Sequence, residues 1–164
     1  MKQSLILLTA LLASCGAYAT TTINGSVESK CIITTDTDGV YGNPTGDVLS
    51  TEPTDGGVTP IIRYDIITAD AYVAKISHPD TFSSSPELAD TVTWTGDTEA
   101  GQMSDALMSA FNTGKVEYNN TTEFDLSVAG SVWFEVTSEA DYGYEKAFPA
   151  GNYSAVVTAE CVAQ

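Results

Sequence analysis

The feature that most constrains the fold of this chain is an alternation of apolar and polar residues that recurs along most of its length. Residues 123–128 alternate at every position, and residues 132–136 continue the pattern. A period of two over about four to eight residues is typical of a half-buried β-strand. We expect strands in these two segments and also in residues 23–33, 58–68, 71–77, 91–95, 115–118 and 153–161.

One stretch follows a different period. Met103, Leu107 and Phe111 recur at intervals of four residues, and Gly114 beyond them is a common stop signal for a helix. We predict one short helix near residues 103–111 that covers one end of the sheets. About seven to nine short strands and this single helix favour an all-β chain, folded as an immunoglobulin-like β-sandwich.

The N-terminal residues 1–19 have the layout of a secretory signal peptide, with one positive charge ahead of an apolar run. That run is far shorter than the 20 or so residues of a membrane-spanning helix, and we expect no integral membrane segment. Cleavage after Ala19 leaves one β-sandwich domain over residues 20–164, secreted or displayed at the cell surface. The sequence around Cys15 also fits a lipoprotein signal, and anchoring through an acylated Cys15 stays open as an alternative.

Cysteine usage predicts one covalent cross-link. Cys31 and Cys161 are the only cysteines of the sequence outside the signal region. In an oxidising compartment, two cysteines most simply form one disulfide. It would join the first strand to the last and lie buried between or beside the sheets. Closing a loop of about 130 residues contributes roughly 4–5 kcal/mol in the chain-entropy treatment.

The chain is strongly acidic, with 22 acidic against 6 basic residues and a formal net charge of −16. Such a surface repels nucleic acid phosphates, and we exclude nucleic acid as a partner. Acidity also raises the question of cation binding. Asp36 and Asp38 resemble the start of a Ca²⁺ loop, although the pair also suits a tight turn and no bidentate Glu follows. We expect no other cofactor.

The sequence shows no constellation that indicates catalysis. His78 is the only histidine and precedes a proline, and no Gly-x-Ser-x-Gly motif is present. We therefore expect a protein that is not an enzyme. Aromatic side chains could still stack on a ligand such as a sugar. Trp94 alternates with Val92 and is expected to face the core, whereas Trp133 lies opposite its apolar neighbours and is the better candidate for a ligand contact.

Both ends of the chain resemble chaperone–usher fimbrial subunits of the archaic, spore coat protein U-like type. The opening Ile23-Asn24-Gly25-Ser26-Val27 is similar to the Gly-x-Val first strand of these subunits, which is followed by a cysteine, here Cys31. Tyr41-Gly42 stands in for a Phe-Gly turn of the subfamily, and residues 149–153 resemble the approach to its last strand. Unlike the family, the predicted strand over residues 58–68 contains no cysteine.

The resemblance implies a pilin-like sandwich that acts as a structural or adhesin-like subunit of an extracellular fibre, with copies of itself or related subunits as partners. In this family an N-terminal donor segment completes the sheet of a neighbouring subunit, which assigns strand exchange to Ile23, Gly25 and Val27. Only three residues of the mature chain, 20–22, precede the predicted first strand.

The predicted disulfide leaves two alternatives open for that assembly. A bridge between Cys31 and Cys161 holds their Cα atoms within about 7 Å. An inserted strand would instead separate its two neighbours by about 9–10 Å. Either the donor inserts beyond the bridge, or the sandwich is self-complete and serves as a secreted or lipid-anchored module that binds a glycan or Ca²⁺.

Overall fold

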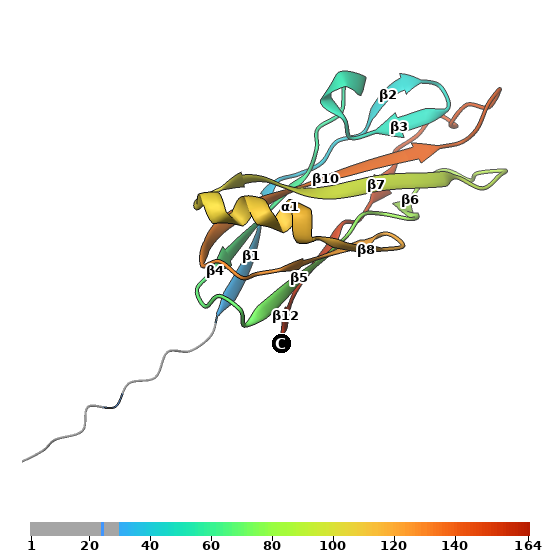
Figure 1. Cartoon of the computed structure of the whole chain (residues 1–164). Helices are drawn as coiled ribbons and strands as arrows, with labels where there is room; N and C mark the ends of the chain where they lie inside the picture. The colour runs from blue at the N-terminus through green and yellow to red at the C-terminus, as the bar shows by residue number, and fades with distance from the viewer. Residues whose placement is uncertain (1–23, 25–29) are drawn as a thin grey trace, which may run out of the picture.

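Antiparallel strands build nearly all of the computed structural model of this protein, which describes residue 24 and residues 30–164 (Figure 1). The first sheet has the order β1-β4-β10-β3-β2, and β7 pairs with the other side of the long strand β10. Its strands are β1 (Cys31–Thr37), β2 (Gly42–Thr45), β3 (Val48–Ser50), β4 (Ile61–Ile66), β7 (Thr93–Met103) and β10 (Gly130–Asp141).

The second sheet packs against the first and has the order β12-β5-β9-β8. A separate pair, β6 with β11, continues the β5–β12 pair after an interruption. These strands are β5 (Tyr72–Ser77), β6 (Phe82–Ser84), β8 (Val116–Tyr118), β9 (Thr121–Asp125), β11 (Ser154–Ala155) and β12 (Thr158–Ala163). The sandwich expected from the alternation is therefore confirmed.

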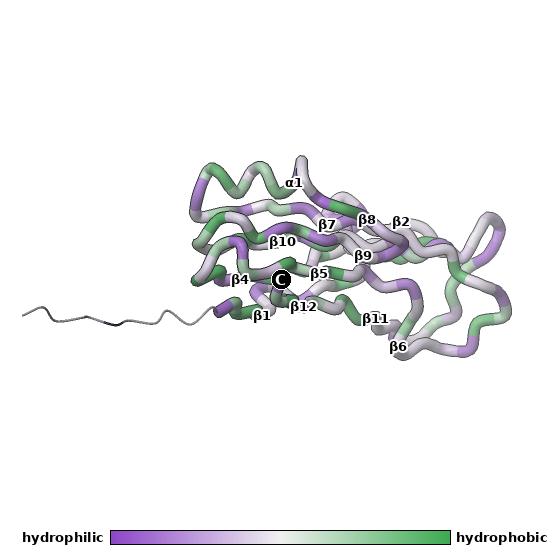
Figure 2. The backbone as a smooth tube through the Cα atoms, turned by 60° about the horizontal axis from the view of Figure 1, so that its bottom comes forward, coloured by the Kyte–Doolittle hydropathy of each residue, from purple (hydrophilic) through white to green (hydrophobic). Residues whose placement is uncertain are grey.

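The strands are more numerous and less even than the sequence indicates. Twelve strands occur among the described residues, against the seven to nine expected, because several are only two to four residues long. The stretch over residues 153–161 is divided into β11 and β12, yet its odd-numbered side chains do face inward and its even-numbered ones are exposed. Figure 2 shows apolar and polar residues interspersed along the tube.

The helical segment begins later than the predicted 103–111. Met103 is the last residue of β7 and pairs with Val132 of β10, because this ladder continues past the point where the helical period starts. A 3-10 helix then covers Ala106–Ser109, with the Asp105 carboxylate accepting a hydrogen bond from the backbone N–H of Leu107. It leads into α1 (Ala110–Gly114). The helix lies between the β7 edge of one sheet and the second sheet, and it buries Met108 and Phe111.

One apolar core fills the space between the sheets. Phe134 of β10 lies at its centre, with ring centroids 4.4 Å from Phe124 and 5.3 Å from Tyr64. The inner faces of both sheets contribute the other buried side chains: Ile62, Ile66, Ala74, Ile76, Ala100, Leu126, Val132 and Val136. A second aromatic group surrounds Phe82, and Trp94 belongs to it with ring centroids 4.7 Å apart, in keeping with its expected packing role.

The predicted disulfide is present between Cys31 and Cys161, with Cα atoms 6.4 Å apart. It joins β1 to β12, the edge strands of the two sheets on one side of the sandwich. Both cysteines are partly buried and pack against the core. A disulfide indicates folding in an oxidising compartment outside the cytoplasm. Within residues 30–164 no helix has the length and apolar character needed to cross a membrane; the predicted signal peptide lies outside the described residues.

Candidate functional site

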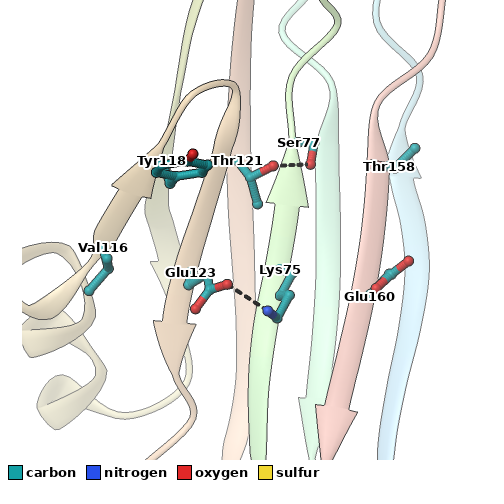
Figure 3. A pocket seen from close by; sticks show the side chains of 8 residues that line it. All are labelled: Lys75, Ser77, Val116, Tyr118, Thr121, Glu123, Thr158 and Glu160. Carbon is teal, nitrogen blue, oxygen red and sulfur yellow. Dashed lines mark hydrogen bonds and ion pairs between the residues drawn. The ribbon is translucent and has the colours of Figure 1, made fainter.

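Two hollows in the described surface are candidates for function. The smaller, of about 440 Å³, lies on the outer face of the second sheet and is lined by side chains of β5, β8, β9 and β12 (Figure 3). The larger, of about 680 Å³, is a groove on the side of the sandwich that carries the disulfide. The groove lies between the end of β1 and residues 151–157, and we call it the edge groove.

A covalent bond and a hydrogen bond join the two sheets at one end of this side. There, the disulfide joins the start of β1 to β12. Next to it, the buried hydroxyl of Tyr64 on β4 donates a hydrogen bond to the backbone carbonyl of Glu160 on β12, with a distance of 3.0 Å. Ile62, two residues back along β4 on the same inner face, already lines the edge groove. The groove therefore begins directly beyond the bridge and Tyr64.

A β-bulge sits where β1 begins to line the edge groove. Thr35 pairs with Ile62 and Thr37 pairs with Ile61, which leaves Asp36 as the extra residue. Bulges bend and twist a strand, and they are common at sheet edges. Beyond the bulge, residues 38–41 form one wall of the groove and residues 151–157 form the other.

The floor of the edge groove is the inner face of the first sheet. Leu49, Ile62, Thr51 and Ser138 form it. At its rim, the hydroxyl of Tyr41 lies 2.9 Å from that of Ser138, and burial raises the pKa of Tyr41 even though this hydrogen bond opposes the shift. The four floor side chains are themselves buried, so the groove is shallow above them.

Several side chains along the walls are exposed. Thr35 has the inward parity of Cys31 and Ile33, yet it is exposed. Val40 and Val156, on opposite walls, are 55% and 58% exposed. Exposed apolar side chains that flank a groove often mark an interaction surface.

Both walls also offer unpaired strand edges. In the described sheets β1 pairs only with β4, and the short strand β11 on the other wall pairs only with β6. Each therefore has one edge whose backbone groups no strand of the described chain satisfies, and such an edge is a ready template for another strand. From Thr35 to Tyr41 the wall spans about 20 Å at roughly 3.3 Å per residue, enough for an extended segment of six or seven residues.

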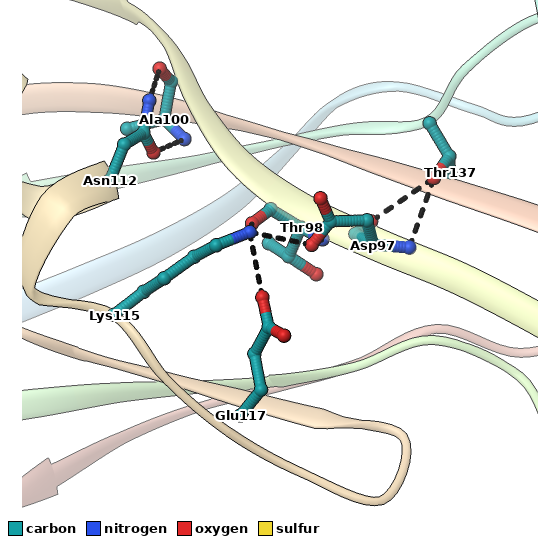
Figure 4. A network of polar contacts seen from close by, with 7 residues as sticks. All are labelled: Asp97, Thr98, Ala100, Asn112, Lys115, Glu117 and Thr137. Carbon is teal, nitrogen blue, oxygen red and sulfur yellow. Dashed lines mark hydrogen bonds and ion pairs between the residues drawn. The ribbon is translucent and has the colours of Figure 1, made fainter.

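The opposite side of the sandwich is built differently, because side chains cap the free edge of β7 (Figure 4). Asn112 of α1 bonds both backbone groups of Ala100, accepting from its N–H at 2.7 Å and donating to its carbonyl at 2.9 Å. Lys115 donates to the Thr98 carbonyl at 3.3 Å. These contacts occupy the positions that a further strand would need.

Lys115 is held in place by two carboxylates. Its ammonium group lies 2.7 Å from Asp97 and 2.8 Å from Glu117. Burial opposes the charge of this amine, but the hydrogen bonds and charges of Asp97 and Glu117 outweigh burial and raise its pKa. One edge is thus closed by a fixed polar network, whereas the edges along the groove carry no such cap in the described residues.

The other candidates from the sequence are scattered. Trp133 lies half-buried on the outer face of the first sheet, with the Arg63 guanidinium 5.3 Å from its ring centroid. Its indole N–H donates to Asp36 at 3.4 Å, while Asp38 lines the edge groove. Within residues 30–164, no group of three His, Cys, Asp or Glu side chains is placed to hold a metal ion. Ca²⁺ binding at Asp36 and Asp38 stays a prediction.

Ile23, Gly25 and Val27, which the resemblance predicts to take part in strand exchange, lie outside the described residues. Sequence reasoning named the first and last strands but missed the groove residues Leu49 and Ser138, which come from strands in the middle of the chain. Only the apolar residue Val40, which directly follows the turn signal Asp38-Gly39, could have drawn attention to a wall. No protein-family model, curated protein or solved structure matches this chain.

Proposed function

We propose that this protein is a secreted, non-enzymatic structural or adhesin-like subunit of an extracellular fibre, which assembles by β-strand addition. The observation that carries the proposal is the edge groove, whose floor includes Leu49 and Ile62 and whose walls each contain a strand with one unpaired edge. In strand addition, main-chain hydrogen bonds supply affinity and alternate side chains fill the groove. The capped edge of β7 supports the same interpretation, since this molecule blocks one edge and leaves the other accessible.

The position of the disulfide is compatible with this mechanism. The bridge closes the gap only at the level of Cys31 and Cys161, and the edge groove begins beyond it. A donor strand therefore inserts beyond the bridge, and the sandwich need not be self-complete.

The proposed donor is the segment over residues 20–29 of another copy. Its alternation places Ile23, Gly25 and Val27 on one face, which would meet the floor formed by Leu49 and Ile62. The groove of one copy and the donor of the next are different surfaces. Such a head-to-tail contact does not close on itself and builds open filaments.

The test compares the mature chain 20–164 with a chain that lacks residues 20–29, by size-exclusion chromatography with light scattering and by electron microscopy. The mature chain is expected to form filaments or a ladder of oligomers, and the truncated chain a monomer. Ile23→Asp with Val27→Asp should abolish assembly, because two charges would be buried against Leu49 and Ile62. The matched control, Asn24→Asp with Ser26→Asp, adds the same charge on the other face and should assemble.

Filaments that form without residues 20–29 would contradict strand exchange by this segment. A mature chain that stays monomeric favours the second candidate function, a self-complete secreted or lipid-anchored module that binds a small ligand. The observation in favour of that candidate is the hollow on the outer face of the second sheet, which takes no part in the edge groove.

A further inference from the structure

The hollow on the outer face of the second sheet is built from two parallel rows of side chains, each crossing all four strands. The strand register places Val116, Glu123, Lys75 and Glu160 in one row, from β8 through β9 and β5 to β12. The same register places Tyr118, Thr121, Ser77 and Thr158 in the neighbouring row. Figure 3 shows these eight side chains, and they are the lining of the hollow.

The second row is a band of hydroxyl groups. The hydroxyls of Ser77 and Thr121 lie 2.7 Å apart, and Thr158 extends the band onto β12. Hydroxyl oxygens both donate and accept hydrogen bonds, so this band suits a ligand that does the same.

Charges in the first row alternate from strand to strand, with Glu123 on β9, Lys75 on β5 and Glu160 on β12. Lys75 pairs with Glu123 at 2.6 Å, which neutralises both groups. The carboxylate of Glu160 has no hydrogen-bond or ion partner among the described residues, and it faces the hollow from the other side of Lys75. A free carboxylate is a strong acceptor for hydroxyl donors of a ligand.

The β8 edge of the hollow is apolar and exposed. Tyr118 is 76% exposed and Val116 is 62% exposed, so neither side chain serves the core. Aromatic rings combine a large apolar face with a polar tip. At the rim of a polar hollow, such a ring offers a stacking surface to the C–H groups of a ligand whose hydroxyls meet the band.

We propose that this face binds a neutral oligosaccharide. A sugar presents the two features that the hollow complements: hydroxyl groups that donate and accept in turn, and an apolar ring face that stacks on Tyr118. An anionic glycan is disfavoured, because Glu160 is unpaired and the whole chain carries a net charge of −16. The volume of about 440 Å³ lies within the usual range for small-molecule sites. No residue lines both this hollow and the edge groove, so the inference does not depend on fibre formation.

The experiment applies the mature chain to a printed array of neutral, amino-bearing and sulfated or sialylated oligosaccharides, with isothermal titration of the best neutral hit. We expect retention on neutral oligosaccharides. Tyr118→Ala should weaken this binding by about tenfold, from the loss of ring stacking, and Glu160→Gln should weaken it as well. The matched control is Tyr144→Ala, since Tyr144 is 87% exposed and does not line the hollow.

Far-UV circular dichroism and melting curves of each variant establish that it is folded; both tyrosines are exposed, so little change is expected. The proposal is overturned if the array retains the protein on no neutral oligosaccharide. It is equally overturned if the protein binds only amino-bearing or anionic oligosaccharides. It is also overturned if folded Tyr118→Ala binds as tightly as the parent chain. The truncated chain without residues 20–29 keeps every residue that lines the hollow. It should therefore still bind the array even though it cannot assemble, so the two proposals can fail independently.

Discussion

Tyr64 shows how a single side chain closes one end of the sandwich. Its ring is fully buried against Phe134, and its hydroxyl reaches across to the Glu160 carbonyl of the other sheet. Burial, and then the negative charge of Glu160, raise the pKa of Tyr64 far above the ordinary value of 10.0. The phenol therefore stays neutral in the folded protein at a pH at which an unfolded chain would ionise it.

Tyr64→Phe should lower the free energy of unfolding by about 1–2 kcal/mol, because a buried hydrogen bond between the sheets is lost. Stability of the parent chain should also fall as the pH rises above about 10, since only the unfolded state then releases the Tyr64 proton, and the variant should lose less over that range. Urea unfolding at neutral and alkaline pH measures both effects. Tyr118→Phe is the control, because its exposed hydroxyl makes no hydrogen bond in the described chain. Equal unfolding midpoints for parent and Tyr64→Phe would contradict this account.

At the scale of single elements, the two edges of the first sheet differ in whether side chains cap their backbone groups. On the β7 edge, Asn112 of α1 forms hydrogen bonds with both backbone groups of Ala100. Lys115, directly after α1, donates a hydrogen bond to the Thr98 carbonyl. The β1 edge has a bulge at Asp36 and an open groove. Unprotected edges promote association with other chains, and the cap therefore restricts association to the groove side.

Asn112→Ala tests the cap on β7. The variant should lose about 1–3 kcal/mol of stability, because both backbone groups of Ala100 lose their partner, and it should aggregate more readily through the exposed edge. Chemical unfolding and static light scattering give the two readouts. Gln102→Ala is the matched control, since Gln102 is exposed on the same strand and its side chain makes no hydrogen bond within residues 30–164. Indistinguishable behaviour of the two variants would argue against a protective role.

At the scale of the whole molecule, the two sides of the sandwich are closed differently. The helix and its polar side chains close the side that carries β7. On the opposite side a covalent bond joins the two sheets at one end. The Cys31–Cys161 bridge spans 130 residues and joins the first described strand to the last. It fixes the two sheets relative to each other where the edge groove begins, so it limits how far the walls can separate.

Reduction of the bridge should lower the free energy of unfolding by about 4–5 kcal/mol, because the unfolded chain regains the freedom of a long loop. Urea unfolding with and without reductant measures the loss, and intact mass should rise by two hydrogen atoms on reduction. Cys31→Ser with Cys161→Ser is the control, on which reductant should have no effect. Free thiols in freshly purified exported protein would refute the bridge.

The sequence by itself determined the strands and the cross-link, because both depend on local or countable properties. Alternation of period two reports which face of a strand is buried, and residues 153–161 kept that parity even where the strand is interrupted. Two cysteines outside the signal region left one pairing, and the structure has it. The helix was placed a few residues early, because the pairing of Met103 with Val132 extends β7 into the helical period.

Only the tertiary structure decided where the edge groove and the outer hollow lie, because each is lined by side chains from strands that are far apart in the sequence. Lys75 meets Glu123 across 48 residues, and Tyr41 meets Ser138 across 97. Alternation says that Thr35 faces inward, but not that no layer covers it. The edge groove and the outer hollow arise from which strand edges meet and which remain unpaired, and that choice is made by packing across the whole sandwich rather than by any local pattern.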